Sequence, residues 1–110
     1  MLLSYNISTR IGVMGKMINS VVIKQTDNVA VAIEELAANT QGSFLLPEGF
    51  YKNIEVVDNI PIYHKFAIQS IPNGAPIIKY GEYIGFAGTN IKEGQHVHSH
   101  NVISKRKDFK

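Results

Sequence analysis

Histidine is concentrated in one short stretch of this chain. Three of its four histidines, His96, His98 and His100, alternate with single residues of other types. Alternate side chains of an extended strand project from the same face, so this spacing predicts a row of three imidazoles. Each ring could bind a divalent metal, transfer a proton near neutral pH or hydrogen-bond an oxyanion. Alternating polar residues on a solvated edge strand would look the same, but the third histidine and the nearby Lys79 and Tyr80 favour a site.

Three other polar residues are weaker candidates, because each also has an ordinary structural explanation. Lys79 comes just before a hairpin turn predicted at Gly81–Glu82, where surface lysines are common. His64 lies in a weakly alternating segment, and a lone histidine of this kind is usually structural or on the surface. Asp27 could simply accept hydrogen bonds within a polar turn. These residues become site candidates only in combination with the histidine row.

The composition excludes several classes of protein. The 110 residues carry a formal net charge of +2, and much of the positive charge lies in residues 105–110. The rest of the chain shows no basic face interleaved with aromatic residues, so we expect no nucleic-acid partner. The absence of cysteine excludes a disulfide framework, a thiolate zinc site and a cysteine nucleophile.

No stretch of the sequence has the pattern of a membrane-spanning or secretory segment. No run approaches the ~18 consecutive apolar residues of a spanning helix. The N-terminal stretch up to Met17 lacks the order of charged and then apolar residues that marks a signal peptide. We therefore expect no membrane partner and a cytoplasmic location.

The length predicts one domain, because domains most often contain about 100–150 residues. Residues 1–16 are expected to form an N-terminal extension, disordered or not native to the protein, because a strand-like pattern begins at Met17. The domain itself is expected to span residues 17–103. Residues 104–110 lose apolar periodicity and predict a basic tail or a linker to another domain.

Three segments repeat one pattern, in which an alanine is followed by a branched apolar residue four positions later and by glycine or asparagine three positions beyond that. Glycine and asparagine tolerate a positive φ angle better than other residues. Each segment therefore predicts a short connection that closes with a left-handed residue and leads into a new strand. Such devices indicate a compact all-β unit with abrupt reversals. The three segments are Ala32–Asn39, Ala67–Gly74 and Ala87–Gly94.

The remaining segments predict short strands joined by turns. Gly85 lies inside a strand pattern, which indicates a bulge or the close approach of another backbone. The predicted elements are strands over residues 18–23, 29–33 and 54–57, turns at 27–28 and 58–61, a hairpin over 76–86, and a loop or short hairpin with aromatic anchors over 42–53.

Several blocks of this sequence, taken together, resemble a known family. They are Asp27–Ala32, His64–Ala67, Ile78–Ala87 and Gly94–Asn101. In order and spacing they are similar to the N-terminal region of the altronate and galactarate dehydratases, over residues 18–103. That region is a SAF-type domain, so the resemblance implies an all-β, β-clip fold. The sequence departs from the family at Gln95, where an acidic residue is usual, and at Asn39, where glycine is usual.

The resemblance also implies a two-part enzyme. In that family a SAF region precedes a large catalytic region that removes water from a sugar acid with the help of a divalent metal, generally iron or manganese. We therefore expect this chain to be the small subunit or N-terminal domain of such a dehydratase, with a sugar-acid substrate and inactive without its large partner. A similar small subunit belongs to sulfolactate sulfo-lyase, whose large subunit eliminates sulfite instead of water. Homo-oligomerisation is left open.

Within such an enzyme the candidate residues take specific roles. His96 and His98 are expected to serve as acid-base groups or metal ligands, since histidine has an unperturbed pKa of about 6.5. Lys79 would pair with the substrate carboxylate, and Tyr80 would donate a hydrogen bond or pack against the substrate. The other substrate-binding candidates are His100, Asp27 and His64.

A non-catalytic role is the competing interpretation. SAF relatives in sugar-acid synthases and surface-structure assembly bind a carbohydrate or a partner chain without performing chemistry. The same histidines would then be hydrogen-bond donors or interface residues, or the chain would only cap a partner. A neighbouring gene for a large dehydratase region would favour the enzyme, and an upstream secretion signal would favour the assembly module.

Overall fold

The chain folds into short antiparallel strands. The computed structural model describes residues 12–13 and 16–104, and these contain eleven strands and no helix. In this part of the chain there is accordingly no helix long and apolar enough to cross a membrane. The predicted all-β class is confirmed. The strands are β1 (Gly12–Val13), β2 (Lys16–Met17), β3 (Ser20–Val21), β4 (Val29–Ala32), β5 (Gln41–Leu45), β6 (Tyr51–Glu55), β7 (Lys65–Ala67), β8 (Pro76–Lys79), β9 (Glu82–Ala87), β10 (His96–Val97) and β11 (Val102–Ile103).

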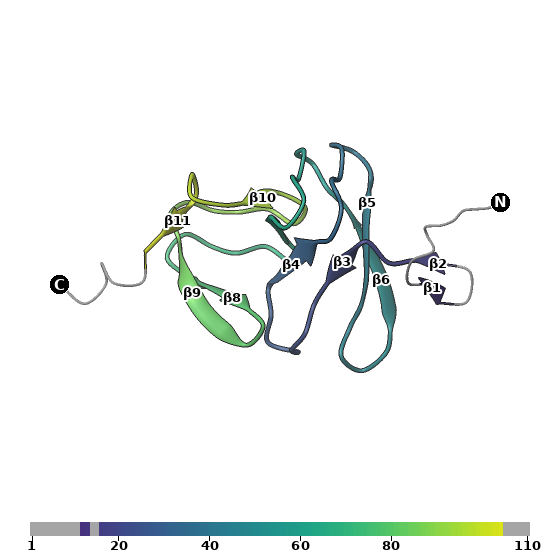
Figure 1. Ribbon diagram of the computed structural model, residues 1–110. Helices are drawn as coiled ribbons and strands as arrows, with labels where there is room; N and C mark the ends of the chain where they lie inside the picture. Colours follow the sequence, from purple (N-terminus) through teal and green to yellow (C-terminus); the bar gives the residue numbers. More distant parts are fainter. Residues whose placement is uncertain (1–11, 14–15, 105–110) are drawn as a thin grey trace.

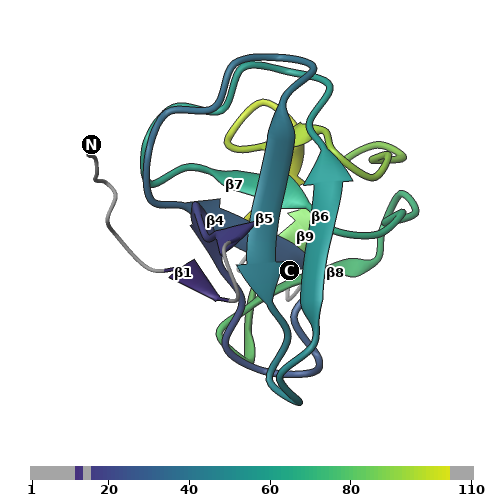
Figure 2. The same cartoon turned by 90° about the vertical axis from the view of Figure 1, so that its right-hand side faces the viewer.

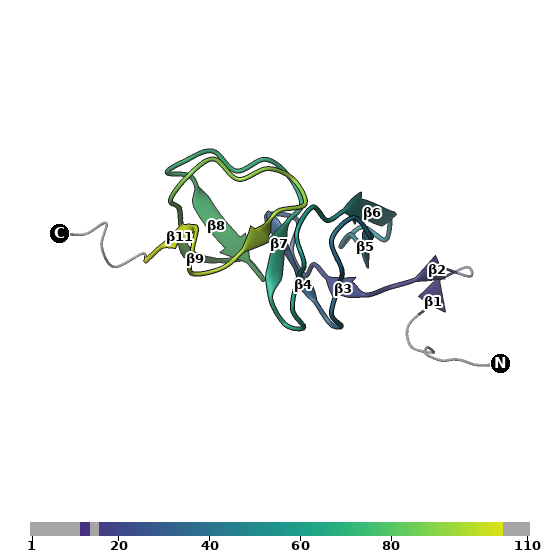
Figure 3. The ribbon, with the colours of Figure 1, turned by 90° about the horizontal axis from the view of Figure 1, so that it is seen from above.

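A four-stranded sheet in the order β10-β7-β4-β3 lies at the centre of the molecule. A three-stranded sheet, β11-β9-β8, lies on one side of it, and the β5–β6 hairpin lies on the other (Figures 1 and 3). The β5–β6 hairpin stands in front of β4 and β7 in Figure 2. β1 and β2 pair only with each other. The central sheet is therefore covered on both faces.

The central strands contribute to two separate hydrophobic cores, because successive side chains of a strand point to opposite faces. Ala30 and Phe66 belong to the core on the β5–β6 side, whereas Val29 and Ala67 belong to the core on the β8–β9 side. All four residues of β4 are buried. Burial on both faces explains why Val29–Ala32 is continuously apolar instead of alternating.

The predicted left-handed residues are present at all three repeats. Asn39, Gly74 and Gly94 have φ angles of 71°, 88° and 89°. In each case the next residue donates a backbone hydrogen bond to the carbonyl three positions before it, which closes a turn. The interpretation of the repeats as abrupt reversals is thus confirmed.

The structure contains a fourth copy of this device that the sequence pattern did not reveal. Val56 and Ile60 take the places of the alanine and the branched residue, and Tyr63 closes the turn with a φ of 69°. A tyrosine at positive φ is uncommon, so the pattern that ends in glycine or asparagine does not identify this copy. The four copies form two pairs.

Each pair is held together by reciprocal hydrogen bonds. The branched residues exchange backbone bonds across an isolated bridge, Leu36 with Ile60 and Ile71 with Ile91. The N–H of each left-handed residue donates to the carbonyl of the first residue of the paired copy. These four bonds, at 2.7–2.8 Å, run from Asn39 to Val56, from Tyr63 to Ala32, from Gly74 to Ala87 and from Gly94 to Ala67. The two pairs pack into different cores, so the fold consists of two similar clips that share a central sheet.

The β8–β9 hairpin differs from the prediction in its turn but agrees with it at Gly85. The β8–β9 turn lies at Tyr80–Gly81, with φ angles of 55° and 81°, and not at Gly81–Glu82. Both central residues of such a two-residue hairpin loop need positive φ. Gly81 is the second of these residues, whereas the prediction made it the first. At Gly85 both predicted features occur, because the register shifts beside it and an added Cβ would lie 2.8 Å from the Ile103 carbonyl oxygen.

Residues 42–53 belong to the β5–β6 hairpin, but the expected aromatic anchors are only partly present. Phe44 is fully buried, whereas Phe50 is 68% exposed near the hairpin tip. Of the expected terminal segments, residues 12–13 and 16 take part in the β1–β2 pair. The remainder of residues 1–16, and residues 105–110, lie outside the described residues.

The tyrosine at the fourth turn leads to a stability prediction. An L-residue in the left-handed region costs about 1–2 kcal/mol, and glycine avoids this at an entropic cost of about 0.5–1 kcal/mol. Tyr63 is 71% exposed, so little packing is lost when its ring is removed. We expect Tyr63→Gly to raise the free energy of unfolding by about 0.5–1 kcal/mol in urea denaturation.

The matched control is Gly74→Ala, because an added Cβ there meets no atom within 4 Å and only the φ of 88° matters. It should lower the free energy of unfolding by about 1 kcal/mol. A Tyr63→Gly protein less stable than wild type would contradict the prediction and show that the ring packs against the fold.

Candidate functional site

The four histidines meet at one end of the central sheet, but not as the predicted row on one strand. β10 ends at Val97, and His98 to Asn101 form a turn instead of continuing the strand. The Asn101 N–H donates to the His98 carbonyl at 3.0 Å, which closes this turn. The expectation of an extended segment through His100 is therefore wrong, although the imidazoles still come together.

The rings form a stacked cluster. The centroid of His64 lies 4.1 Å from that of His98 and 5.1 Å from that of His96, with the ring planes within 16° of parallel. The ring centroid of His96 lies 5.5 Å from that of His98 and 5.2 Å from that of His100. A hydrogen bond of 2.9 Å joins His64 Nδ1 and His96 Nε2, one of which must be the donor. His64, one of the weaker sequence candidates, thus contacts both His96 and His98 in the cluster.

Neighbouring strands and polar side chains fix this arrangement. β10 pairs with β7, so His96 and the residue after His64 belong to adjacent strands. Asn101 is buried, accepts a bond from the His98 N–H and donates one to the His96 carbonyl, both at 2.9 Å. The Asp58 carboxylate accepts a 2.9 Å bond from the His96 N–H. The cluster is therefore held by its backbone before any ligand binds.

The sequence alone predicts no role in the site for Asp58 or Asn101. Asp58 is expected only as part of a turn, and Asn101 only as the end of the block Gly94–Asn101. Carboxylate and amide oxygens readily accept backbone hydrogen bonds in turns, so both residue types were compatible with this role. What the sequence could not show is that these particular bonds hold two of the site histidines.

The surroundings of His96 and His98 disfavour protonation of these two imidazoles. Burial and then the charges of His100, His64 and His98 lower the pKa of His96 to about 4, against a weak opposing effect of Asp58. Burial likewise lowers the pKa of His98, helped by the charges of His64, Lys65 and His100. His96 is therefore neutral at pH 7, the form that binds metal or accepts a proton.

Three of the histidines lie close enough together to be candidate ligands of a divalent metal ion. One ring nitrogen from each of His64, His96 and His98 lies within 4.8 Å of the other two. Three nitrogens about 2.1 Å from a shared ion lie at most about 3.6 Å from one another when evenly spaced, so the most distant pair must close by up to about 1.2 Å. The stacked rings must also rotate, because each lone pair lies in its ring plane. His100, the fourth ring, contacts His96 only at the edge of the trio.

Lys65 is a site residue that sequence reasoning missed. It is half-buried on β7 and lines a groove of about 310 Å³ together with His98 and four other residues, Ile84, Ser99, Val102 and Ser104. Burial, and then the charge of Lys79, lower the pKa of Lys65. The only sequence signal was its position directly after His64. The predicted Lys79 thus acts on the site electrostatically, while its Nζ lies 5.3 Å from the ring centroid of Tyr80.

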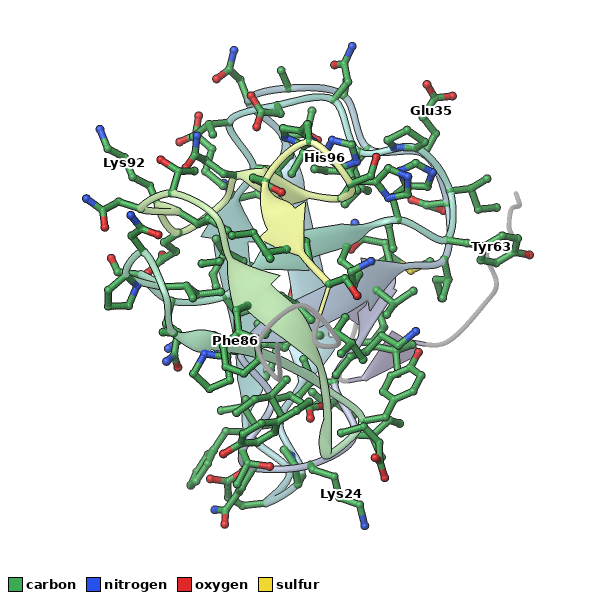
Figure 4. The ribbon with its side chains drawn as sticks, turned by 90° about the vertical axis from the view of Figure 1, so that its left-hand side faces the viewer. Lys24, Glu35, Tyr63, Phe86, Lys92 and His96 are labelled. Carbon is green, nitrogen blue, oxygen red and sulfur yellow. The ribbon has the colours of Figure 1, made fainter. Side chains whose placement is uncertain are left out.

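Asp27 lies with the backbone of the turns instead of with the histidines. It is 4% exposed, and its carboxylate accepts hydrogen bonds from the N–H groups of Ile23, Lys24 and Gly81 at 2.7–3.1 Å. Lys24 lies at the opposite end of the molecule from His96 in Figure 4. The structure gives Asp27 a role in joining two turns, and substrate binding by Asp27 stays a prediction.

A second groove lies at this opposite end, between the residue 24–27 loop and the β5–β6 hairpin. Its volume of about 380 Å³ exceeds that of the groove beside His98. Its lining includes no histidine, and its two acidic residues, Asp27 and Glu48, already accept hydrogen bonds. The chemistry of the lining, and not the volume, therefore places the candidate active site at the histidine cluster.

Comparison with known proteins gives a consistent family assignment. Residues 18–105 match the family described as the altronate/galactarate dehydratase SAF domain. The chain is 38% identical over 87 residues to altronate dehydratase of Escherichia coli (strain K12) and, equally, of Bacillus subtilis (strain 168). These matches cover 79% of this chain but only 17% and 16% of the two relatives. The chain therefore spans about a sixth of the length of these relatives.

A shorter relative is also similar. The (2R)-sulfolactate sulfo-lyase subunit alpha of Chromohalobacter salexigens is 48% identical over 52 residues. This match covers 47% of the chain and 55% of that subunit.

The low pKa of His96 predicts that the fold weakens in acid. The unfolded pKa is about 6.5 and the folded value about 4, so between them the unfolded chain binds more protons. The free energy of unfolding should therefore be fully retained above about pH 6.5 and fall as the pH drops towards 4. Urea denaturation at pH 7 and pH 5 should show a smaller loss for His96→Asn than for wild type. Equal losses would contradict the assignment of this shift to His96.

Proposed function

Because the chain belongs to the altronate/galactarate dehydratase SAF domain family, we propose that it is the SAF module of a hydro-lyase acting on a sugar acid. Its histidine cluster would contribute to an active site completed by a large catalytic region. The observation that carries this proposal is the convergence of four imidazoles at one end of the domain, while the groove at the opposite end has no histidine in its lining. The relatives' names supply the reaction class, since both are altronate dehydratases.

Dehydration of a 2,3-dihydroxy acid needs two proton transfers. A base removes the proton from the carbon beside the carboxylate, and the electron pair forms an enediolate. The hydroxyl group on the next carbon then takes a proton and leaves as water. His98 is the better candidate for these transfers, because it lines the groove and contacts His64. His96 has the lower pKa and is better suited to holding a ligand or orienting His98.

The same cluster would hold the divalent metal, iron or manganese, of the proposed enzyme. His64, His96 and His98 are its candidate ligands. When bound, such an ion binds substrate oxygens and offsets the negative charge that develops on them. The substrate would face these residues from the groove, with His100 at the rim and Lys79 and Tyr80 along the neighbouring hairpin.

A second substrate class is favoured by one comparison. The subunit alpha of (2R)-sulfolactate sulfo-lyase matches at 48% identity, higher than either altronate dehydratase. Elimination of sulfite starts with the same proton removal, so the histidine cluster would serve both reactions. We propose the sugar acid first, because the altronate dehydratases match over 79% of the chain. A cytoplasmic location is part of the proposal and accords with the absence of cysteine.

The acid-base role predicts a loss of rate on removing one ring. His98→Ala, assembled with its cognate large catalytic region, should dehydrate altronate or galactarate at least ~10-fold more slowly. The chain alone should show no turnover. Lys92→Ala is the control and should lie within about twofold of wild type, because Lys92 is exposed and does not belong to the cluster or its groove. A His98→Ala rate within about twofold of wild type, with the complex intact, would reduce the chain to a scaffold.

The metal role makes a separate prediction that needs no activity. Titration of the chain with Mn²⁺ or Fe²⁺ under anaerobic conditions, followed by calorimetry, should show one site. His64→Ala should weaken binding by at least ~10-fold, because it removes one of three candidate ligands. His100→Ala should bind like wild type. Unchanged affinity in His64→Ala would exclude the trio as the metal site.

A further inference from the structure

The groove beside His98 carries positive charge that no described acidic side chain balances. Lys65 is half-buried in its wall beside His98, and the charge of Lys79 is near enough to act on Lys65. Neither lysine forms an ion pair within residues 12–13 and 16–104. Asp58, the acidic neighbour of His96, uses an oxygen to accept the His96 N–H. The site therefore concentrates cationic and hydrogen-bond-donating groups.

Keeping an ammonium group in this position has an energetic cost. A partly buried charge loses hydration, and a second like charge nearby raises the cost further. A structural lysine would normally place its head in open water and leave only its stem against the protein. The side chain of Lys65 instead lines a groove, and its backbone lies on the middle strand β7, which pairs with β4 on one side and β10 on the other. Such a group is stabilised when an anion enters the groove.

The groove also has the dimensions and lining of a small-molecule site. Its volume of about 310 Å³ is at the lower end of the range for ligand pockets, about 300–1,000 Å³. Ile84 and Val102 supply an apolar wall, and Ser99 and Ser104 supply hydroxyl groups. One lysine, one histidine and two hydroxyl groups beside an apolar surface suit a short, hydroxylated organic acid.

We propose that Lys65, assisted by Lys79, binds the anionic group of the substrate and so places the adjacent carbon within reach of His98. This inference deepens the proposed function and depends on it for the identity of the acid. A carboxylate and a sulfonate would both satisfy Lys65, so the residue selects an anion and not one particular acid. Lys65 is then a positioning residue, distinct from the acid-base group.

The test measures binding and catalysis separately. Lys65→Met keeps most of the aliphatic stem and removes the charge, Lys65→Arg restores the charge, and Lys92→Met removes an exposed lysine elsewhere. NMR titration of the chain uses galactarate, a dianion, and galactitol, its neutral counterpart. The KM for galactarate of the assembled enzyme is measured for the same variants.

Galactarate should bind and galactitol should not. Lys65→Met should raise the Kd, or the KM where the chain alone binds too weakly, by at least ~10-fold, because it removes one partner of a desolvated charge pair. Lys65→Arg should stay within about threefold of wild type, and Lys92→Met should be unchanged. Wild-type Kd and KM values in Lys65→Met, or an equal loss in Lys92→Met, would overturn the proposal.

The two proposals can fail independently. Binding of galactarate through Lys65 by a complex that dehydrates no sugar acid would reject the dehydratase and keep the anion site. Dehydration with an unchanged KM in Lys65→Met would reject the anion site and keep the dehydratase. Thermal unfolding of each variant identifies any substitution that acts only by destabilising the fold.

Discussion

A reciprocal backbone hydrogen bond between paired turns is the interaction on which the rest of this structure depends. Each left-handed residue donates its N–H to the first residue of the paired segment, and the same bond occurs four times. The site is built directly on this device, because His64 follows the left-handed Tyr63 and His96 lies two residues after the left-handed Gly94. These two turns come from different clips, so the histidines meet only when both clips have formed on the shared sheet.

The two-faced burial of the central sheet explains why the chemistry lies at its end. β4 is fully buried between two cores, and its two alanines leave room for close packing on the β5–β6 side. Functional side chains can therefore occur only where β7 and β10 emerge from the cores. Lys65, at the start of β7, and His96, at the start of β10, occupy such positions. The fold thus separates the residues that stabilise it from those available for binding.

Sequence reasoning predicted the parts of this structure that depend on local backbone chemistry. Three turns could be predicted from the residue type alone, because few residues tolerate positive φ; these turns close at Asn39, Gly74 and Gly94. Tyr63 gave no such signal, because its conformation is imposed by the paired copy and not favoured by its side chain. The histidine alternation predicted a row, but Asn101 turns the chain back after Val97. Lys65 could not be found from the sequence, because its importance comes from its burial and its neighbours, which are set by tertiary structure.

The triple attachment of Asn101 has a consequence for the entropic cost of ligand binding. One amide side chain and one backbone N–H fix the loop that carries His98 and His100, at three hydrogen bonds of 2.9–3.0 Å. The backbone positions of His98 and His100 are thus set by hydrogen bonds within the chain. A loop ordered in this way has little conformational entropy left to lose when a ligand of any kind binds beside it.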